Sequence, residues 1–136
     1  MRLMDRVRDA MVVDPPLLGG DASAQEAGEA FDRPEVRALF VADDRRFLGV
    51  VTRKTLVREV VAAGRDPRST RLRDIVEVPL NTIGSELPLD EAFGFLEEHD
   101  LERVPVLEDG RLVGVLSRAV LQRRLAEDEP PVDDPG

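Results

Sequence analysis

Residues 44–53 read DRRFLGVVTR, and residues 109–118 read DGRLVGVLSR. The two stretches lie 65 positions apart and share one order: a polar turn, an apolar strand containing a glycine, a hydroxyl residue and an arginine. The match continues outward without a gap, since residues 6–9 (RVRD) fall on residues 71–74 (RLRD). Chance similarity rarely keeps register over so long a segment, so the chain is an internal duplication.

Each copy predicts the same order of elements, a βαββα unit. A capping box at Ser23 and Glu26 opens a helix that runs to about Phe31, and the matching helix starts near Pro88. Two short strands joined by a polar turn follow in each copy, and a second helix follows the strands. The predicted strands are residues 38–42, 47–52, 103–107 and 111–116, and the predicted second helices are residues 53–63 and 118–126.

The duplication predicts the domain organisation. We expect residues 1–64 to form repeat 1, residues 65–126 to form repeat 2, and residues 127–136 to form a disordered acidic tail. A unit of about 60 residues is marginal alone, so the tandem repeats are expected to pack by pseudo-twofold symmetry into one domain of the α/β (α+β) class. Such packing leaves two clefts between the repeats, where strand ends and helix N-termini converge and a ligand is expected to bind.

Composition excludes several classes of protein. The 136 residues include no cysteine, which excludes disulfides, thiolate metal sites and cysteine nucleophiles. The net charge is −9, and an acidic protein is poorly suited to nucleic acid. No apolar run approaches the roughly 20 residues that span a bilayer, and no signal peptide is visible. We therefore expect a cytoplasmic protein that binds neither nucleic acid nor membrane.

No catalytic constellation is predicted. His99 is the only histidine, and it stands beside Glu97, Glu98 and Asp100 at a predicted helix end. A solvated histidine and a member of a metal site are the two interpretations, and the solvated one is favoured. Gly19–Gly20 is not followed by the Lys and Ser/Thr of a phosphate-binding loop. The sequence therefore predicts a binding protein rather than an enzyme, with no catalytic residue and no metal.

The paired strand motif resembles that of cystathionine-β-synthase-type (CBS) domains. Residues 103–107 (RVPVL) and 114–118 (GVLSR) resemble the family's Val-Pro-Val strand and Gly-x-x-Thr/Ser strand end, and residues 49–53 (GVVTR) repeat the second motif. The resemblance covers residues 3–126 and implies a free-standing Bateman module. Such a module binds an adenosyl compound in its clefts and regulates a separate partner protein. AMP, ADP, ATP and S-adenosylmethionine are the implied regulatory ligands, and none is a required cofactor.

The resemblance also implies where a ligand is held. In the family a hydroxyl at the positions of Thr52 and Ser117 lies near ligand phosphate or ribose, and an Asp three residues later binds the ribose. Thr55 and Val120 replace that Asp here. A hydrogen bond to a charged group contributes about 1.5–3 kcal/mol, so its loss lowers affinity about 10- to 150-fold. We expect the cleft with Thr55 to contact ribose better than its twin. The predicted ligand-binding residues are Leu39, Val51, Thr52, Arg53, Thr55, Arg103, Val104, Pro105, Ser117 and Arg118.

These residues also have a structural interpretation. Thr52 and Ser117 each precede a predicted helix, so either hydroxyl is equally a candidate N-cap. Arg53 and Arg118 begin those helices, where they face either an anion or the solvent. Arg103 precedes the Val-Pro-Val residues of its strand, and it likewise faces either an anion or the solvent. The sequence leaves these alternatives open.

Two predicted helices have broad apolar surfaces that bear on whether the chain forms a homodimer. Phe95 widens the apolar stripe of one predicted helix, and Val57, Val60 and Val61 widen that of another. A broad stripe is also normal for a helix that only faces the core. The resemblance favours pairing of two copies through these helices. The alternative function is a scaffold that dimerises or docks to a partner without binding a ligand, and it is motivated by the missing ribose carboxylate in both repeats.

Overall fold

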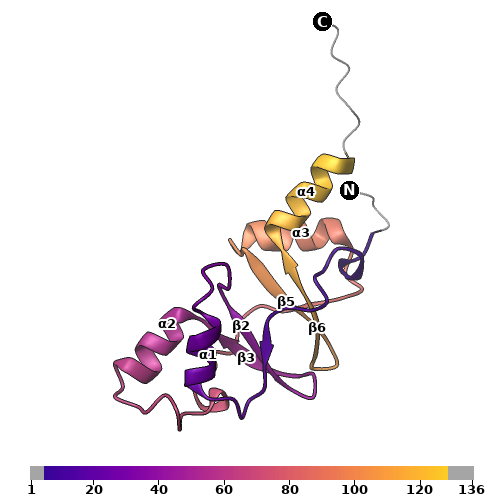
Figure 1. Ribbon diagram of the computed structural model, residues 1–136. Coiled ribbons are helices and arrows are strands. Elements are labelled where there is room, and N and C mark those ends of the chain that lie inside the picture. Colours follow the sequence, from indigo (N-terminus) through magenta and orange to yellow (C-terminus); the bar gives the residue numbers. More distant parts are fainter. Residues whose placement is uncertain (1–4, 129–136) are drawn as a thin grey trace, which may run out of the picture. The chain divides into compact units, whose positions relative to one another are not determined.

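The computed structural model describes residues 5–128 and divides into two compact units (Figure 1). We call residues 14–80 with 109–112 the N-terminal unit, and residues 5–13, 81–108 and 113–128 the C-terminal unit. The strands and helices of each repeat follow the order βαββα. The mixed α/β class and the tandem repeat are therefore confirmed.

The N-terminal unit contains β1 (Leu17–Leu18), α1 (Ala24–Ala30), β2 (Leu39–Asp43), β3 (Arg46–Val51) and α2 (Arg53–Leu56). Strand β2 pairs in parallel with β1 and antiparallel with β3. The predicted capping box is confirmed, because Ser23 Oγ accepts the N–H of Glu26 at 3.1 Å. Helix α2 is shorter than predicted: it passes into a π-helical turn, η2 (Val57–Val61). Gly64, with φ at +71°, follows this turn, a conformation that favours glycine.

The C-terminal unit contains β4 (Ile83–Gly84), α3 (Leu89–Glu98), β5 (Arg103–Glu108), β6 (Arg111–Ser117) and α4 (Arg118–Asp128). The first two residues of β6 belong to the N-terminal unit. Pro88 is the N-cap of α3 rather than its first residue, a shift of one position from the prediction. Residues 127 and 128 of the predicted tail end α4, and the rest of that tail lies outside the described residues.

A short segment from repeat 2 completes the N-terminal unit. Residues 70–78, which include the 3₁₀ turn η3 (Leu72–Asp74), belong to this unit. The N–H groups of Leu72 and Arg73 donate to the carbonyls of Ala22 and Gly20 at 2.9 and 3.0 Å. We call residues 70–78 and their equivalents, residues 5–13, the leading segments of the two repeats.

The C-terminal unit receives the other leading segment in the same way. This segment contains the 3₁₀ turn η1 (Val7–Asp9). The N–H groups of Val7 and Arg8 donate to the carbonyls of Leu87 and Ser85, both at 3.0 Å. These are the same two hydrogen bonds as in the N-terminal unit, displaced by 65 residues. The repeats thus exchange their leading segments. The predicted division at residues 64 and 65 follows the duplication, whereas the compact units cross it.

Each exchanged segment contributes a core residue. Leu72 and Val7 are both 0% exposed. The core of the N-terminal unit is Ala24, Ala27, Phe31, Leu39, Val41, Val51, Val60, Leu72 and Ile75. The core of the C-terminal unit is Val7, Ile83, Leu89, Ala92, Leu96, Val104, Val106, Leu116 and Leu121. Burying a leucine side chain stabilises the fold by about 1.5–3 kcal/mol, so neither repeat has a complete core by itself.

Leu72→Ala is expected to lower the free energy of unfolding by about 2–5 kcal/mol, because it leaves a cavity in the core. Leu80→Ala is the matched control, since Leu80 is 99% exposed, and it is expected to change stability by less than about 0.5 kcal/mol. Urea titration followed by far-UV circular dichroism measures both variants. A loss below about 1 kcal/mol for Leu72→Ala would contradict the role of the leading segment in the core.

Candidate functional site

The carboxyl end of β3 forms a closed pair of hydroxyl residues. Thr52 is the N-cap of α2, and its Oγ1 accepts the N–H of Thr55 at 3.3 Å. Thr55 Oγ1 accepts the N–H of Thr52 at 3.0 Å, and the two hydroxyl oxygens lie 3.1 Å apart. Thr55 is 0% exposed, whereas Thr52 is half-buried. The capping interpretation of Thr52 is therefore confirmed, and Thr55 presents no surface to a ligand in this conformation.

The carboxyl end of β6 is the looser equivalent. Ser117 is half-buried, and its Oγ accepts the N–H of Val120 at 3.5 Å, a long hydrogen bond. Val120 stands where Thr55 stands in repeat 1, and it has no hydroxyl to return a second hydrogen bond. The hydroxyl of Ser117 is thus held by fewer and weaker contacts than that of Thr52.

Arg53 is bound to the end of the preceding helix. Its Nη2 donates to the carbonyls of Phe31 and Arg33 at 2.7 and 2.9 Å, and its guanidinium lies 5.0 Å from the centroid of the Phe31 ring. Phe31 is the C-cap of α1, so a positive charge there complements the unpaired carbonyls of the helix end. This arrangement differs from both sequence interpretations, which were a bound anion and the solvent.

Arg118 repeats this contact in the C-terminal unit. Its Nη2 donates to the carbonyl of Leu96, in the last turn of α3, at 2.8 Å. Its Nη1 lies 3.4 Å from Glu102 and 3.6 Å from Asp100. Only Nε of Arg118 is buried without a partner among the residues that the structure describes. Both arginines therefore serve first as caps of helix C-termini.

The remaining predicted ligand-binding residues differ in how far they are buried. Leu39, Val51 and Val104 are core residues, and Pro105, which follows Val104, is also buried. Arg103 begins β5 and is exposed. Within residues 5–128 no ion pair of Arg103 is found. Arg103 is thus the predicted basic residue that stays accessible to an anion.

A charged cluster that the sequence analysis did not assign holds a leading segment in place. The N–H of Gly20 donates to Asp43 at 2.8 Å, and Arg73 Nη2 donates to the same carboxylate at 2.9 Å. The Gly20 bond first, and then Arg73, lower the pKa of Asp43 below its usual 3.8. Arg73 also donates to Asp21 at 2.9 Å, and this bond with that to Asp43 raises the pKa of Arg73. The sequence signal for this cluster was the match of residues 6–9 (RVRD) with residues 71–74 (RLRD), which contains Arg73.

The same cluster recurs in the C-terminal unit. Arg8 of the other leading segment forms an ion pair with Glu86, and Ser85 Oγ donates to Glu108. Arg8, Ser85, Glu86 and Glu108 lie 65 positions from Arg73, Gly20, Asp21 and Asp43. These clusters are therefore part of the repeated scaffold rather than a site of one repeat.

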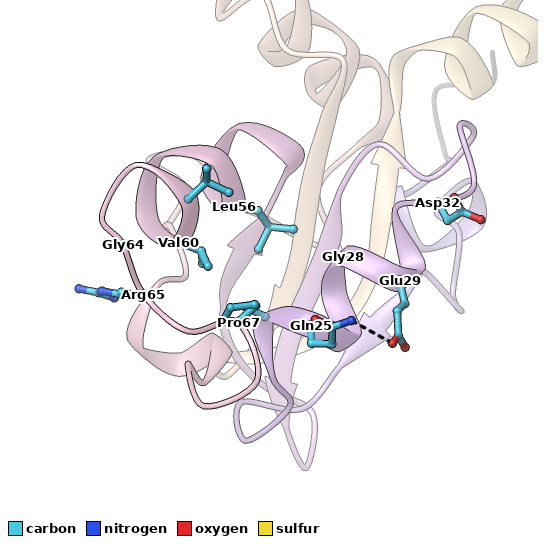
Figure 2. Close-up of a pocket in the computed structure, with 11 residues that line it drawn as sticks. Gln25, Gly28, Glu29, Asp32, Leu56, Val60, Gly64, Arg65 and Pro67 are labelled. Carbon is cyan, nitrogen blue, oxygen red and sulfur yellow. Dashed lines mark hydrogen bonds between the residues drawn. The ribbon is translucent and has the colours of Figure 1, made fainter.

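A groove between α1 and α2 was also missed by the sequence analysis. It has a volume of about 720 Å³, and in Figure 2 α1 with Gly28 forms one wall while Leu56, Val60 and Pro67 lie on the other. Gln25 Nε2 donates to Glu29 at 3.4 Å on the α1 wall. The lining residues are Ala24, Gln25, Gly28, Glu29, Asp32, Leu56, Val60, Val61, Gly64, Arg65 and Pro67.

The residues predicted to widen the helix surfaces have different environments. Val60 is a core residue, whereas Val57 and Val61 are 57% and 74% exposed. Phe95 is half-buried and packs against the core of the C-terminal unit. Its ring centroid lies 4.4 Å from that of His99. Of these four residues, the two that are exposed, Val57 and Val61, lie on η2 of the N-terminal unit.

Within the described part of the chain, no group of three or more His, Cys, Asp or Glu residues is placed to hold a metal ion. None of the helices in residues 5–128 is long and apolar enough to cross a bilayer.

Comparison with known proteins identifies relatives over nearly the whole chain. The CBS domain model matches twice, over residues 7–62 and 72–127. Hypoxic response protein 1 of Mycobacterium tuberculosis is 28% identical over 125 residues, which are 91% of this chain and 87% of that protein. The CBS domain-containing protein YhcV of Bacillus subtilis is 23% identical over 114 residues, 84% of this chain and 81% of the relative.

Solved structures agree with this result. The crystal structure of Hypoxic Response Protein I, described with two coordinated zinc ions, superposes with a TM-score of 0.75 at 27% identity, covering 89% of this chain and 99% of that one. The CBS domain pair of protein MJ0100, solved with 5'-methylthioadenosine and S-adenosyl-L-methionine, gives a TM-score of 0.68 at 18% identity. That alignment covers 93% of this chain and 99% of the other.

Thr52→Ala is expected to lower the free energy of unfolding by about 1 kcal/mol, because it removes the N-cap hydrogen bond of α2. Ser117→Ala is the matched change in the other repeat and is expected to have a smaller effect, since its bond is 3.5 Å long. Urea titration measures both. An equal or larger loss for Ser117→Ala would contradict the difference between the two strand ends.

Asp43→Asn is expected to make stability less dependent on pH. A carboxyl whose pKa is lowered on folding stabilises the native state above its unfolded pKa and loses this contribution as pH falls through its folded pKa. The variant is therefore expected to be less stable than the parent at pH 7, with a difference that shrinks as pH falls below 3.8. Urea titrations at pH 7 and pH 3 measure it, with Asp44→Asn as the control for the substitution itself. The same difference at both pH values would contradict this assignment.

Proposed function

Because the chain belongs to the CBS domain family, we propose that it binds an adenine nucleotide or another adenosyl compound and signals to a separate partner protein. CBS pairs are generally regulatory domains rather than enzymes. The observation that carries this proposal is the doubled strand end, in which Thr52 and Ser117 each place a hydroxyl beside a helix N-terminus. A hydroxyl there can donate to a ribose or phosphate oxygen of the ligand.

We infer that the hydroxyl of Ser117 is the freer of the two to bond a ligand, because the two half-buried residues differ in their hydrogen bonds inside the protein. The hydroxyl of Thr52 is held by Thr55, while that of Ser117 makes one long bond. Exposed Arg103, in the same unit, supplies a cation for a phosphate. The sequence alone favoured the strand end with Thr55, but Thr55 is buried and bonded to Thr52.

The ligand class follows from the family and the chemistry of these groups. A hydroxyl and an arginine suit a nucleotide with a phosphate, while the absence of a ribose carboxylate at Val120 favours an abundant nucleotide over a scarce messenger. The CBS pair of MJ0100 is described with S-adenosyl-L-methionine and 5'-methylthioadenosine, which adds adenosyl compounds without phosphate to the candidates. No ligand is required as a cofactor for folding in this proposal.

Calorimetric titration with AMP, ADP, ATP and S-adenosylmethionine tests the proposal, since the chain has no Trp or Tyr for fluorescence. We expect one ligand to bind with a dissociation constant of roughly tens to hundreds of micromolar. Val120→Asp restores a carboxylate and is expected to tighten binding about 10- to 150-fold. Ser117→Ala is expected to weaken it. No heat with any of the four at millimolar concentration defeats the proposal.

A scaffold without a ligand is the second candidate. It is favoured by Thr55 and Val120 at the usual ribose positions, and by the arginines Arg53 and Arg118, which are bound to backbone carbonyls. Such a scaffold acts by dimerising or docking to a partner. Its melting temperature is expected to be unaffected by nucleotides, whereas a ligand that binds the native state raises it by mass action. The same ligand series therefore separates the two candidates. In both, we propose a homodimer.

A further inference from the structure

The pairing of β3 with β6 places two arginines opposite each other. Arg46 and Arg111 are Cα partners in this antiparallel pair, and both are exposed. The ladder hydrogen bonds lie on either side of them, donated by the N–H groups of Phe47 and Leu112 at 3.1 and 2.8 Å. At such a position, without a backbone hydrogen bond of its own, the Cα atoms are about 4.5 Å apart and both side chains rise from one face of the sheet. Two positive charges therefore start from neighbouring points of one surface.

This arrangement does not stabilise the scaffold. Arg46 and Arg111 are equivalent residues of the two repeats, 65 positions apart, and both belong to the N-terminal unit. Like charges directly opposite each other destabilise a sheet. A bound anion would offset this repulsion, and it would find a positive point on a chain whose net charge is −9.

The neighbouring carboxylates are engaged elsewhere. Asp43 precedes one of the two turns, and its oxygens accept the N–H of Gly20 at 2.8 Å and Nη2 of Arg73 at 2.9 Å. Glu108 precedes the other turn and accepts the hydroxyl of Ser85. Within the part of the chain that the structure describes, neither arginine of the opposed pair forms an ion pair. Their guanidinium groups are therefore free to bind an anion.

A third arginine stands in the turn before β3. Asp44 and Arg45 have φ values of +48° and +71°, and their equivalents Asp109 and Gly110 have +52° and +79°. Asp-Gly is a favoured pair for such a turn, whereas a bulky residue with positive φ is strained. Arg45 is exposed, and within residues 5–128 neither it nor the two Asp residues of the turns form an ion pair. Repeat 1 thus keeps a positive charge next to the pair at a position that favours glycine.

We propose that Arg45, Arg46 and Arg111 form a binding site for a phosphate group. The planar fork of a guanidinium matches phosphate oxygens with two parallel hydrogen bonds. A phosphate group carries a charge of about −1.5 to −2 at pH 7 and three strong acceptor oxygens, so it can bind two forks and offset both charges. A carboxylate has one charge and two oxygens, and it satisfies one fork.

The site is separate from the strand ends of the proposed function. Arg46 begins β3, whereas Thr52 follows its other end, roughly 20 Å away along the strand. Arg111 likewise begins β6, and Ser117 ends it. The inference therefore adds a second site and does not require a ligand at either hydroxyl.

Calorimetric titration with pyrophosphate tests the site, with sodium chloride added to hold the ionic strength constant. We expect the parent protein to bind with a dissociation constant of roughly millimolar or below. Arg46→Gln and Arg111→Gln are each expected to raise this constant about tenfold or more, because each removes hydrogen bonds to a charged group. Arg68→Gln is the matched control: it removes the same charge from an exposed position of the same unit, and affinity is expected to hold. No heat from the parent, or equal affinity in all four proteins, overturns the proposal.

Melting temperatures separate binding from a structural role. Without pyrophosphate, Arg46→Gln is expected to hold or raise the melting temperature because it removes a like-charged pair. Arg45→Gly is expected to do the same because it replaces a strained residue. With pyrophosphate at constant ionic strength, the melting temperature of the parent is expected to rise by mass action, and that of both variants to rise less. Far-UV circular dichroism measures these changes, and an equal rise in the three proteins overturns the proposal.

Phosphate reaches the site either as a free ion or as part of a nucleotide, and ATP distinguishes these sources. Weaker binding of ATP by Arg46→Gln, with unchanged binding of S-adenosylmethionine, supports a nucleotide. Unchanged binding of ATP with weaker binding of pyrophosphate supports a free inorganic phosphate.

Ser117→Ala separates this inference from the proposed function. It is expected to weaken a nucleotide at the strand end and to leave pyrophosphate binding unchanged. Loss of pyrophosphate binding in Ser117→Ala overturns a separate site. A protein that binds pyrophosphate but none of the adenosyl compounds defeats only the proposed function and supports this inference.

Discussion

The burial of each leading segment in the core of the other repeat is the constraint on which the rest of the structure depends. Leu72 and Val7 are fully enclosed, and Arg73 and Arg8 tie the same segments to acidic side chains. Removing either segment would expose apolar core to water, at a cost of about 25 cal/mol for each Å². Neither repeat therefore has an independent core. This mutual dependence explains why the duplication keeps its register of 65 residues across scaffold positions while other positions have diverged.

The strand ends show how one residue serves stability and recognition at once. A hydroxyl has one proton and two lone pairs, so bonds made within the protein reduce those left for a ligand. The hydroxyl of Thr52 is hydrogen-bonded to Thr55, while within the described part of the chain that of Ser117 has only the long bond to Val120. The guanidinium groups of Arg53 and Arg118 likewise donate to backbone carbonyls at helix C-termini. The two copies of one motif therefore provide unequal strand ends, and the better cap is the hydroxyl with more hydrogen bonds inside the protein.

The two repeats also differ on a helix surface outside their fully buried core positions. Gly28 replaces the ring seen at Phe93, and the π-helical turn replaces regular α-helix. Leu56, which lines the groove, and Leu121, its equivalent, both stay apolar because each also contacts its core. An exposed or half-buried helix position such as Gly28 or Phe93 can therefore change while the fully buried core positions are kept.

The sequence by itself determined the duplication, the order of strands and helices, the capping box at Ser23 and the resemblance to CBS domains. These features rest on short-range periodicity, on hydrogen bonds between residues three apart, and on motifs read in register. Only the tertiary structure decided that Arg53 reaches the carbonyl of Phe31, that Thr55 is enclosed, and that a groove opens at Gly28. Arg53 and Phe31 lie 22 residues apart, and the leading segments pack across a whole repeat. The direction of a side chain depends on such distant neighbours, which no local pattern specifies.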